Sequence, residues 1–144
     1  MPIRRVFEYR SERDQDLLNA YRRQIALTSG PIRLREVMCR VVNSPSSRFW
    51  VSPERAMRVI SSMEQGNRLE GMMRNKRIMF REIYRRVHLL RERPPYRQLP
   101  LVEVVQMVVE QPAPSFYMTP QSAIVIMHHI RKRRKQCNSS ESRS

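Results

Sequence analysis

The side chains best able to do chemistry in this 144-residue chain are three histidines, two cysteines and scattered acids. His128 and His129 are adjacent, and neighbours on a helix point about 100° apart, so the two do not converge on one metal or nucleophile. Cys39 and Cys137 lack the spacing of a zinc site, and nothing indicates a disulfide between them. The sequence has no glycine-rich phosphate loop and no nucleophile elbow. It therefore predicts a protein that is not an enzyme and needs no metal or cofactor.

Charge is the strongest indication of a partner. The chain carries 28 Lys and Arg against 13 Asp and Glu, a formal net charge of +15. Such an excess attracts polyanions, and the planar guanidinium of arginine suits phosphates and guanine edges. We expect nucleic acid as the partner, with DNA favoured over RNA. An acidic protein and an anionic membrane surface are the alternatives.

Arginines on the expected helices supply the candidate phosphate contacts. The pair Arg85-Arg86 repeats an earlier pair, Arg22-Arg23, and five cations in a row follow Ile130. Paired repetition in so basic a chain favours phosphate contact over a merely solvated helix face. The predicted nucleic-acid-binding residues are Arg55, Arg58, Arg81, Arg85, Arg86, Arg131, Lys132, Arg133, Arg134 and Lys135.

These residues are positioned by a stretch that the chain contains twice, at residues 34–63 and 101–130. The copies align without a gap at an offset of 67 positions. The identical positions are Leu34/Leu101, Glu36/Glu103, Val37/Val104, Val41/Val108, Val42/Val109, Pro45/Pro112, Phe49/Phe116, Pro53/Pro120 and Ala56/Ala123. The flanking helices match as well, so the sequence indicates a duplication of nearly the whole chain.

Apolar residues recur at three- and four-residue spacing, which predicts about six helices and no sheet. The helices are expected at about 14–27, 34–42, 53–64, 74–91, 101–110 and 120–135. The predicted fold is all-α: two tandem three-helix repeats packed together, at residues 11–67 and 74–135. Residues 136–144 are expected to form a disordered tail. Residues 1–12 are interpreted either as a basic arm or as a frayed terminus.

A motif of aromatic residues and proline precedes the third helix of each repeat. Ser52-Pro53 and Thr119-Pro120 are helix starts, with Ser or Thr as the N-cap and Pro at the first helical position. Phe49-Trp50 and Phe116-Tyr117 come just before them. The aromatics form either a platform for a base or peptide, or a hydrophobic staple onto the following helix. The staple is favoured because its distance from the cap is the same in both copies.

The pattern Pro-x-x-x-Phe-[Trp/Tyr]-x-[Ser/Thr]-Pro-x-x-Ala, at 45–56 and 112–123, resembles an uncharacterised family of small basic helical proteins of gut bacteria and their mobile elements. The resemblance covers roughly residues 34–130. No activity is established for that family, so the resemblance implies no site residues.

The sequence thus favours a cytoplasmic nucleic-acid-binding protein that has no membrane-spanning segment. A helix-turn-helix-like arrangement would make 53–64 and 120–135 the recognition helices. Two features weaken that arrangement. The connection 43–51 exceeds the usual short turn, and Ile124-Val125-Ile126-Met127 is apolar on every side, which indicates burial between the repeats or in a homodimer. The alternative function is a scaffold or interaction protein of a mobile element or phage that binds an acidic partner or self-assembles.

Overall fold

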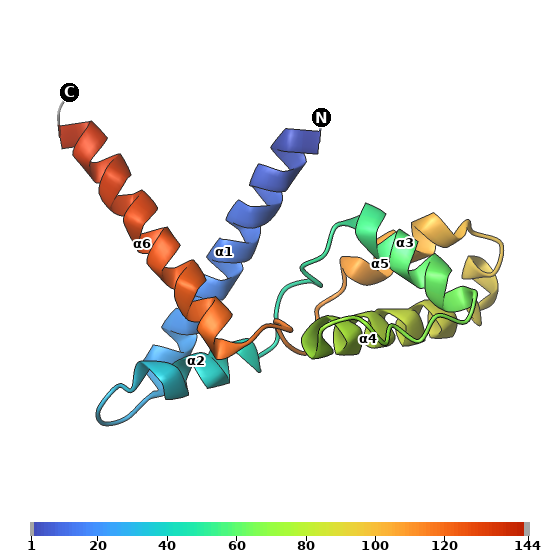
Figure 1. The fold of residues 1–144 in the computed structure, drawn as a ribbon, viewed down its shortest axis with the longest axis horizontal. Helices are drawn as coiled ribbons and strands as arrows, with labels where there is room; N and C mark the ends of the chain where they lie inside the picture. The colour runs from blue at the N-terminus through green and yellow to red at the C-terminus, as the bar shows by residue number, and fades with distance from the viewer. Residues whose placement is uncertain (1, 143–144) are drawn as a thin grey trace. The chain divides into compact units, whose positions relative to one another are not determined.

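The protein is described by a computed structural model that places the backbone of residues 2–142 and the side chains of residues 9–137. It contains six helices, shown in Figure 1: α1 (Pro2–Leu27), α2 (Leu34–Val42), α3 (Pro53–Glu64), α4 (Arg74–Arg91), α5 (Leu101–Val109) and α6 (Pro120–Ser142). A short 3-10 turn, η1 (Pro94–Tyr96), precedes α5. Residues 2–142 form no strand. The prediction of an all-α fold with about six helices is confirmed.

The first and last helices are longer than expected. α1 begins at Pro2 rather than near residue 14, because Pro2 fits a first helical position and neither Pro nor Gly interrupts residues 3–27. α6 continues to Ser142, since nothing after Pro120 breaks a helix. The prediction of a disordered tail from residue 136 is therefore wrong as far as Ser142. Residues 1 and 143–144 lie outside the described residues.

The helices form two compact units. Unit 2 is the contiguous segment Pro45–Tyr117, with α3, α4 and α5. Unit 1 combines Met1–Ser44 with Met118–Ser144, and therefore holds α1, α2 and α6. Within unit 1, α1 and α6 diverge from α2 toward the two ends of the chain (Figure 1).

The units are not the tandem repeats 11–67 and 74–135. α3 packs on α4 and α5, whereas α6 packs on α1 and α2, so each third helix lies in the unit of the other sequence half. The bounds of α2 and α5, and the starts of α3 and α6, still differ by the 67 positions of the sequence alignment. Because α2 and α3 belong to different units, they do not form the expected helix-turn-helix pair.

Unit 2 is organised around one apolar cluster. Phe49, Phe80 and Ile83 are fully buried in it, together with four valines of α5: Val104, Val105, Val108 and Val109. α3 and α4 run in the same direction (Figure 1), since the Arg55 guanidinium lies 5.9 Å from the Phe80 ring and Glu64 pairs with His88 at 2.7 Å. The intervening connection contributes a further buried side chain, Leu69, from a backbone at φ 59°.

Unit 1 has a separate core along α2. Val37, Met38, Val41 and Val42 are buried. α1 covers them with Leu17, Leu18 and Ala20, and α6 with Ala123, Met127 and Ile130. Val125 is 44% exposed, so α6 is not buried on every side as its sequence suggested. Its apolar face serves unit 1, and its opposite face is open.

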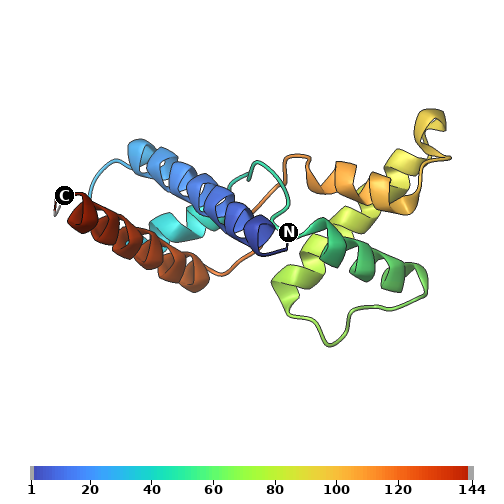
Figure 2. The same ribbon diagram turned by 90° about the horizontal axis from the view of Figure 1, so that it is seen from above.

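Two connections, 43–52 and 110–119, lie side by side at one edge of unit 2 (Figure 2). Ser46 and Ala113 exchange both backbone hydrogen bonds at 3.0 Å, and the Phe49 N–H donates to the Val109 carbonyl at 2.9 Å. The Phe49 and Tyr117 rings stack at 6.0 Å. Arg86 of α4 contacts both connections. Its guanidinium lies 4.9 Å from the Phe49 ring and donates a hydrogen bond to the Pro112 carbonyl at 2.8 Å. We call Ser46, Phe49, Arg86, Ala113 and Tyr117 the clasp.

Both third helices begin with the same cap. The Arg55 N–H donates to the Ser52 hydroxyl at 3.2 Å, and the Ser122 N–H donates to the Thr119 hydroxyl at 3.1 Å. Pro53 and Pro120 are the first helical residues. Phe49 and Phe116 are buried, while Trp50 and Tyr117 are half-buried. Phe49 packs in the same cluster as Ala56 and Ile60 of α3, as a staple onto that helix would.

Candidate nucleic-acid interface

The first two turns of α4 concentrate positive charge. Arg74, Lys76, Arg77 and Arg81 fall within eight residues, and the first turn of α4 contains no acid. Among the described side chains, none of these four forms an ion pair; Arg77 is half-buried and the other three are exposed. The free N–H groups at a helix start carry partial positive charge, so cations there are destabilising. We call these four residues the α4 cations.

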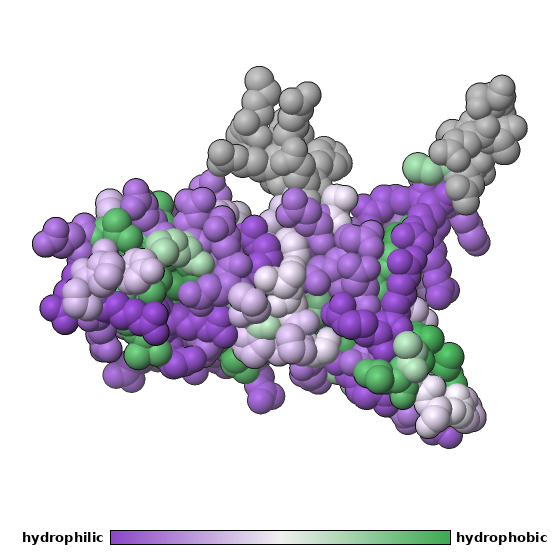
Figure 3. All heavy atoms as spheres, turned by 180° about the vertical axis from the view of Figure 1, so that it is seen from behind, coloured by the Kyte–Doolittle hydropathy of each residue, from purple (hydrophilic) through white to green (hydrophobic). Residues whose placement is uncertain are grey.

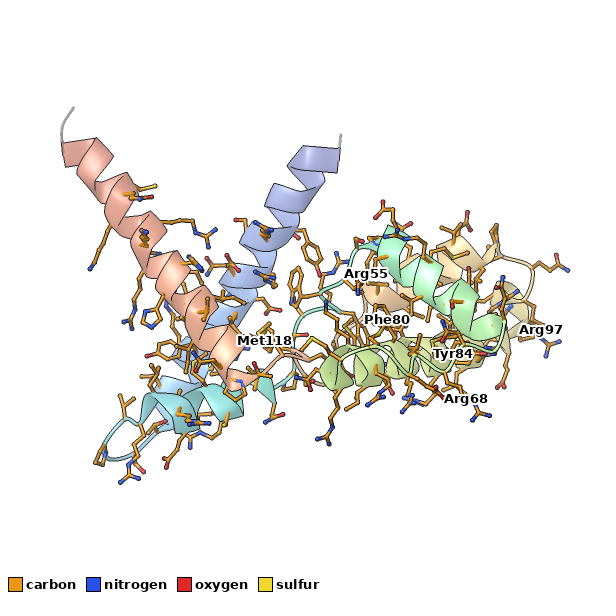
Figure 4. All side chains as sticks on the ribbon, viewed as in Figure 1. Arg55, Arg68, Phe80, Tyr84, Arg97 and Met118 are labelled. Carbon is orange, nitrogen blue, oxygen red and sulfur yellow. The ribbon has the colours of Figure 1, made fainter. Side chains whose placement is uncertain are left out.

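Further cations lie close to this end of unit 2. Arg55 of α3 is exposed and sits against Phe80, one residue before Arg81 (Figure 4). Arg58, one turn further along α3, is also exposed. α3 and α4 run in the same direction, so both helix N-termini point to the same end of the unit. Unit 2 as a whole holds 13 basic and seven acidic residues, a net charge of +6.

The start of α4 has no cap. Met73 is the N-cap residue, its backbone already has cap geometry (φ −60°, ψ 145°), and its side chain is 74% exposed and makes no cap hydrogen bond. Most helix starts carry Ser, Thr, Asp or Asn at this position. The α4 start therefore leaves its N–H groups open toward solvent among four cations, which is the arrangement that favours a phosphate.

Replacing Met73 with Asp is expected to stabilise unit 2 and weaken nucleic-acid binding. The new side chain caps α4, worth about 1 kcal/mol, or a rise in Tm of about 4–8 °C for a domain of this size. Its carboxylate also offsets the nearby cations. Met73→Ser is the matched control, because it supplies the cap without charge. We expect a similar Tm and a smaller loss of affinity, measured by thermal melts and fluorescence anisotropy; an unchanged Tm in both variants would contradict the open helix start.

Arg85 and Arg86 have different environments although they are adjacent. Both pair with Glu82, Arg85 at 2.6 Å and Arg86 at 2.9 Å. The hydrogen bond from Arg85, helped by Arg86, lowers the pKa of Glu82. Arg85 is 60% exposed and continues the line of Arg74, Arg77 and Arg81 at helical spacing. Arg86 is only 23% exposed and belongs to the clasp, which gives it a structural role.

The five cations of α6 lie in unit 1. All five are exposed, on a helix that continues well beyond them. Arg133 is engaged by Asp14 of α1, which is itself buried and also contacts Arg13. His128 and His129 precede these cations and are exposed too. Four of the five cations, Arg131, Lys132, Arg134 and Lys135, make no ion pair among the described side chains.

No metal site emerges among residues 9–137. No group of three or more His, Cys, Asp or Glu side chains in that part of the chain is arranged to hold a metal ion. Cys39 and Cys137 are both exposed, and neither forms a disulfide. None of the described helices has the length and apolar character that crossing a membrane requires.

Comparisons with known proteins assign no family. No protein-family model, no curated protein and no solved structure matches this chain. The resemblance of its Pro-aromatic motif to a family of small basic helical proteins therefore stays a prediction.

Sequence reasoning placed Arg55, Arg58, Arg81 and Arg85 in the interface but left out Arg74, Lys76 and Arg77. The signal was available, because a run of cations without an acid is unusual at a helix start. The structure brings the α4 cations, Arg55 and Arg85 together in unit 2. It places the cations at 131–135 in the other unit.

Proposed function

We propose that this protein binds nucleic acid, DNA in preference to RNA, and that the main contact surface is the α4 cations with Arg55 and Arg85. The observation that carries the proposal is the concentration of cations without acid partners at an uncapped helix start. This arrangement lowers the stability of the free protein and is offset when phosphates bind. A surface that merely keeps the chain soluble needs no such placement.

The geometry suits a phosphate backbone. Arg74, Arg77, Arg81 and Arg85 follow one another every three or four residues, so they line one side of α4. From Arg74 to Arg85 the helix rises about 16 Å, comparable to about five base steps at 3.4 Å each. The arginines contact phosphates of one strand while the α4 start donates backbone N–H groups. These contacts position the duplex and carry no sequence information by themselves.

The cations at 131–135 provide a second contact. They project from a helix whose apolar face is used by unit 1, so they are available without disturbing its core. The two units belong to one chain, so a long polyanion bound at one charged surface stays near the other. Its effective concentration at the second surface is therefore raised. We therefore expect affinity to depend on nucleic-acid length as well as on salt.

A second candidate function is a scaffold or interaction protein that binds an acidic partner or self-assembles. The observation in its favour is an apolar patch at the turn between α1 and α2, visible in green at the lower right of Figure 3. Leu27, Ile32 and Leu34 are exposed there by 77%, 55% and 42%. Exposed apolar side chains that gather within eight residues are typical of protein-binding surfaces.

The nucleic-acid proposal is tested with the triple variant Arg74→Gln, Arg77→Gln and Arg81→Gln. Fluorescence anisotropy of labelled duplex DNA, single-stranded DNA and RNA is measured across a salt series. Each phosphate contact contributes about 0.9 to the slope of log K against log salt for duplex DNA. We expect the slope to fall by about 2–3 and the affinity at low salt to fall at least tenfold.

The matched control is Arg91→Gln, Arg93→Gln and Arg97→Gln, which removes the same charge at the other end of α4. We expect the slope of log K against log salt to fall in this control by less than about a third of its fall in the first triple variant. Circular dichroism establishes that both variants remain folded. The proposal is overturned if the natural chain shows no saturable binding at low salt, or if both variants lose affinity equally.

A further inference from the structure

Unit 1 cannot form its core without α6. Ala123, Met127 and Ile130 of that helix are buried against α1 and α2. Without them, α2 would leave part of its apolar face uncovered in water. The groove between α1 and α2 is therefore a binding site for one amphipathic helix of this particular shape.

The groove accepts the α6 of another copy only if the connection before α6 opens, because the clasp holds Ala113 and Tyr117 beside Ser46 and Phe49. All of unit 2, Pro45–Tyr117, lies between α2 and α6 in the sequence. The structure already shows that a third helix of this chain packs outside its own sequence half.

The connection before α6 contains a strained residue. Tyr117 has φ 53°, in the left-handed region that bulky residues rarely adopt. Strain of this kind costs about 1–3 kcal/mol and persists only while its surroundings impose it. If the connection opens and becomes extended, Tyr117 returns to an ordinary conformation, and this partly offsets the entropic cost of bringing two chains together.

The geometry points to a second copy of this chain as a partner, with the two copies exchanging α6. Each α6 fills the α1–α2 groove of the other copy, and the same core contacts form as in the single chain. The exchange is reciprocal, so it produces a closed dimer rather than a filament. The α6 of the same chain competes with the α6 of a second copy for each groove. The tethered helix has an effective concentration on the order of millimolar, so dimers form when unfolded chains refold at a comparable concentration.

The contact between Asp14 and Arg133 marks where α1 meets α6 and provides a direct test. Two chains are prepared with Cys39→Ser and Cys137→Ser, one carrying Asp14→Cys and the other Arg133→Cys. In an exchanged heterodimer one unit 1 receives both new cysteines, and the other keeps the natural Asp14–Arg133 pair. Mixed refolding at high concentration followed by treatment with a bismaleimide cross-linker, whose span stands in for the arginine side chain, is expected to give a covalent heterodimer. Refolding at about one hundredth of that concentration is expected to give little of it.

Two substitutions of Tyr117 test the strained connection before α6, and these tests do not involve nucleic acid. Tyr117→Asn and Tyr117→Val both lose the ring, but Asn tolerates a left-handed backbone and Val does not. Light scattering after chromatography is expected to show a larger dimer fraction for Tyr117→Val than for Tyr117→Asn. The inference is overturned if the natural chain and both variants, folded by circular dichroism, stay monomeric after refolding at millimolar concentration and no cross-linked heterodimer forms. Neither result bears on DNA binding, which is measured separately.

Discussion

Replacing Phe49 with alanine is expected to lower the free energy of unfolding of unit 2 by about 3–5 kcal/mol. Phe49 is fully buried in the unit 2 cluster, stacks on Tyr117 and lies beneath the Arg86 guanidinium. Its removal leaves a cavity where the two connections meet α4. Small domains are stable by roughly 5–15 kcal/mol, so this one substitution removes a large share of that stability.

Urea denaturation followed by fluorescence measures the effect, because Trp50 is the only tryptophan and lies in unit 2. Phe49→Leu is the control: it keeps much of the apolar volume, and we expect it to cost clearly less than the alanine variant. A loss below about 1 kcal/mol for Phe49→Ala would show that the clasp contributes little to the stability of unit 2.

The second large effect is expected at Arg86. Arg86→Ala removes the donors to Glu82 and to the Pro112 carbonyl and exposes the Phe49 ring, so we expect a loss of about 2–3 kcal/mol. Arg86→Lys is expected to recover less than half of that loss, since an ammonium cannot reproduce the planar fork. Denaturation with urea, again followed through Trp50, provides the measurement.

Arg85→Ala is the matched control for Arg86, because it removes a neighbouring partner of the same Glu82. Arg85 is mostly exposed, so solvent screens its ion pair and the pair contributes little to stability. We expect Arg85→Ala to leave stability nearly unchanged and to weaken DNA binding. Equal destabilisation by the two alanine variants would contradict the structural role assigned to Arg86.

The pH dependence of this group has a definite sign. The pKa of Glu82 is lowered in the folded protein, first by the Arg85 hydrogen bond. Such a carboxylate contributes stability above its unfolded pKa, about 4.3, and loses that contribution as pH falls through the lower folded value. Acid therefore weakens the α4 contacts that position Arg86.

Local features of the fold were predictable because their signals lie within a few residues. Ser52-Pro53 and Thr119-Pro120 start helices whatever the tertiary packing of those helices. The spacing of Val37, Val41 and Val42 defines one apolar face. The full lengths of α1 and α6 were also recoverable, since no Pro or Gly interrupts either of them. Sequence reasoning underestimated them by requiring apolar periodicity to the ends.

The exchange of α3 and α6 was not predictable from the sequence. The two third helices present similar apolar faces, with Ala56 matching Ala123 and Ile60 matching Met127. Either helix therefore suits either groove by composition. Which helix packs in which groove depends on how the two connections pair. Ser46 and Ala113 pair through backbone atoms, so their side chains give no signal of it in the sequence.

The distinction between Arg85 and Arg86 was hidden for a related reason. Neighbouring helical residues point about 100° apart, so one of them faces the clasp and the other faces solvent. The sequence does not reveal which, because the partner carbonyl of Pro112 is 26 residues away. The α4 cations were overlooked although their sequence signal is local.

The discontinuous makeup of unit 1 sets an order of events during synthesis. Unit 2 is contiguous and has all its helices once residue 117 has been made, whereas α1 and α2 wait for Ala123, Met127 and Ile130. At about 5–20 residues per second, the ribosome needs several seconds to proceed from Ser44 to Ile130. During that interval the apolar face of α2 lacks its cover on the nascent chain, so unit 1 is the part of this molecule that most needs protection by a chaperone.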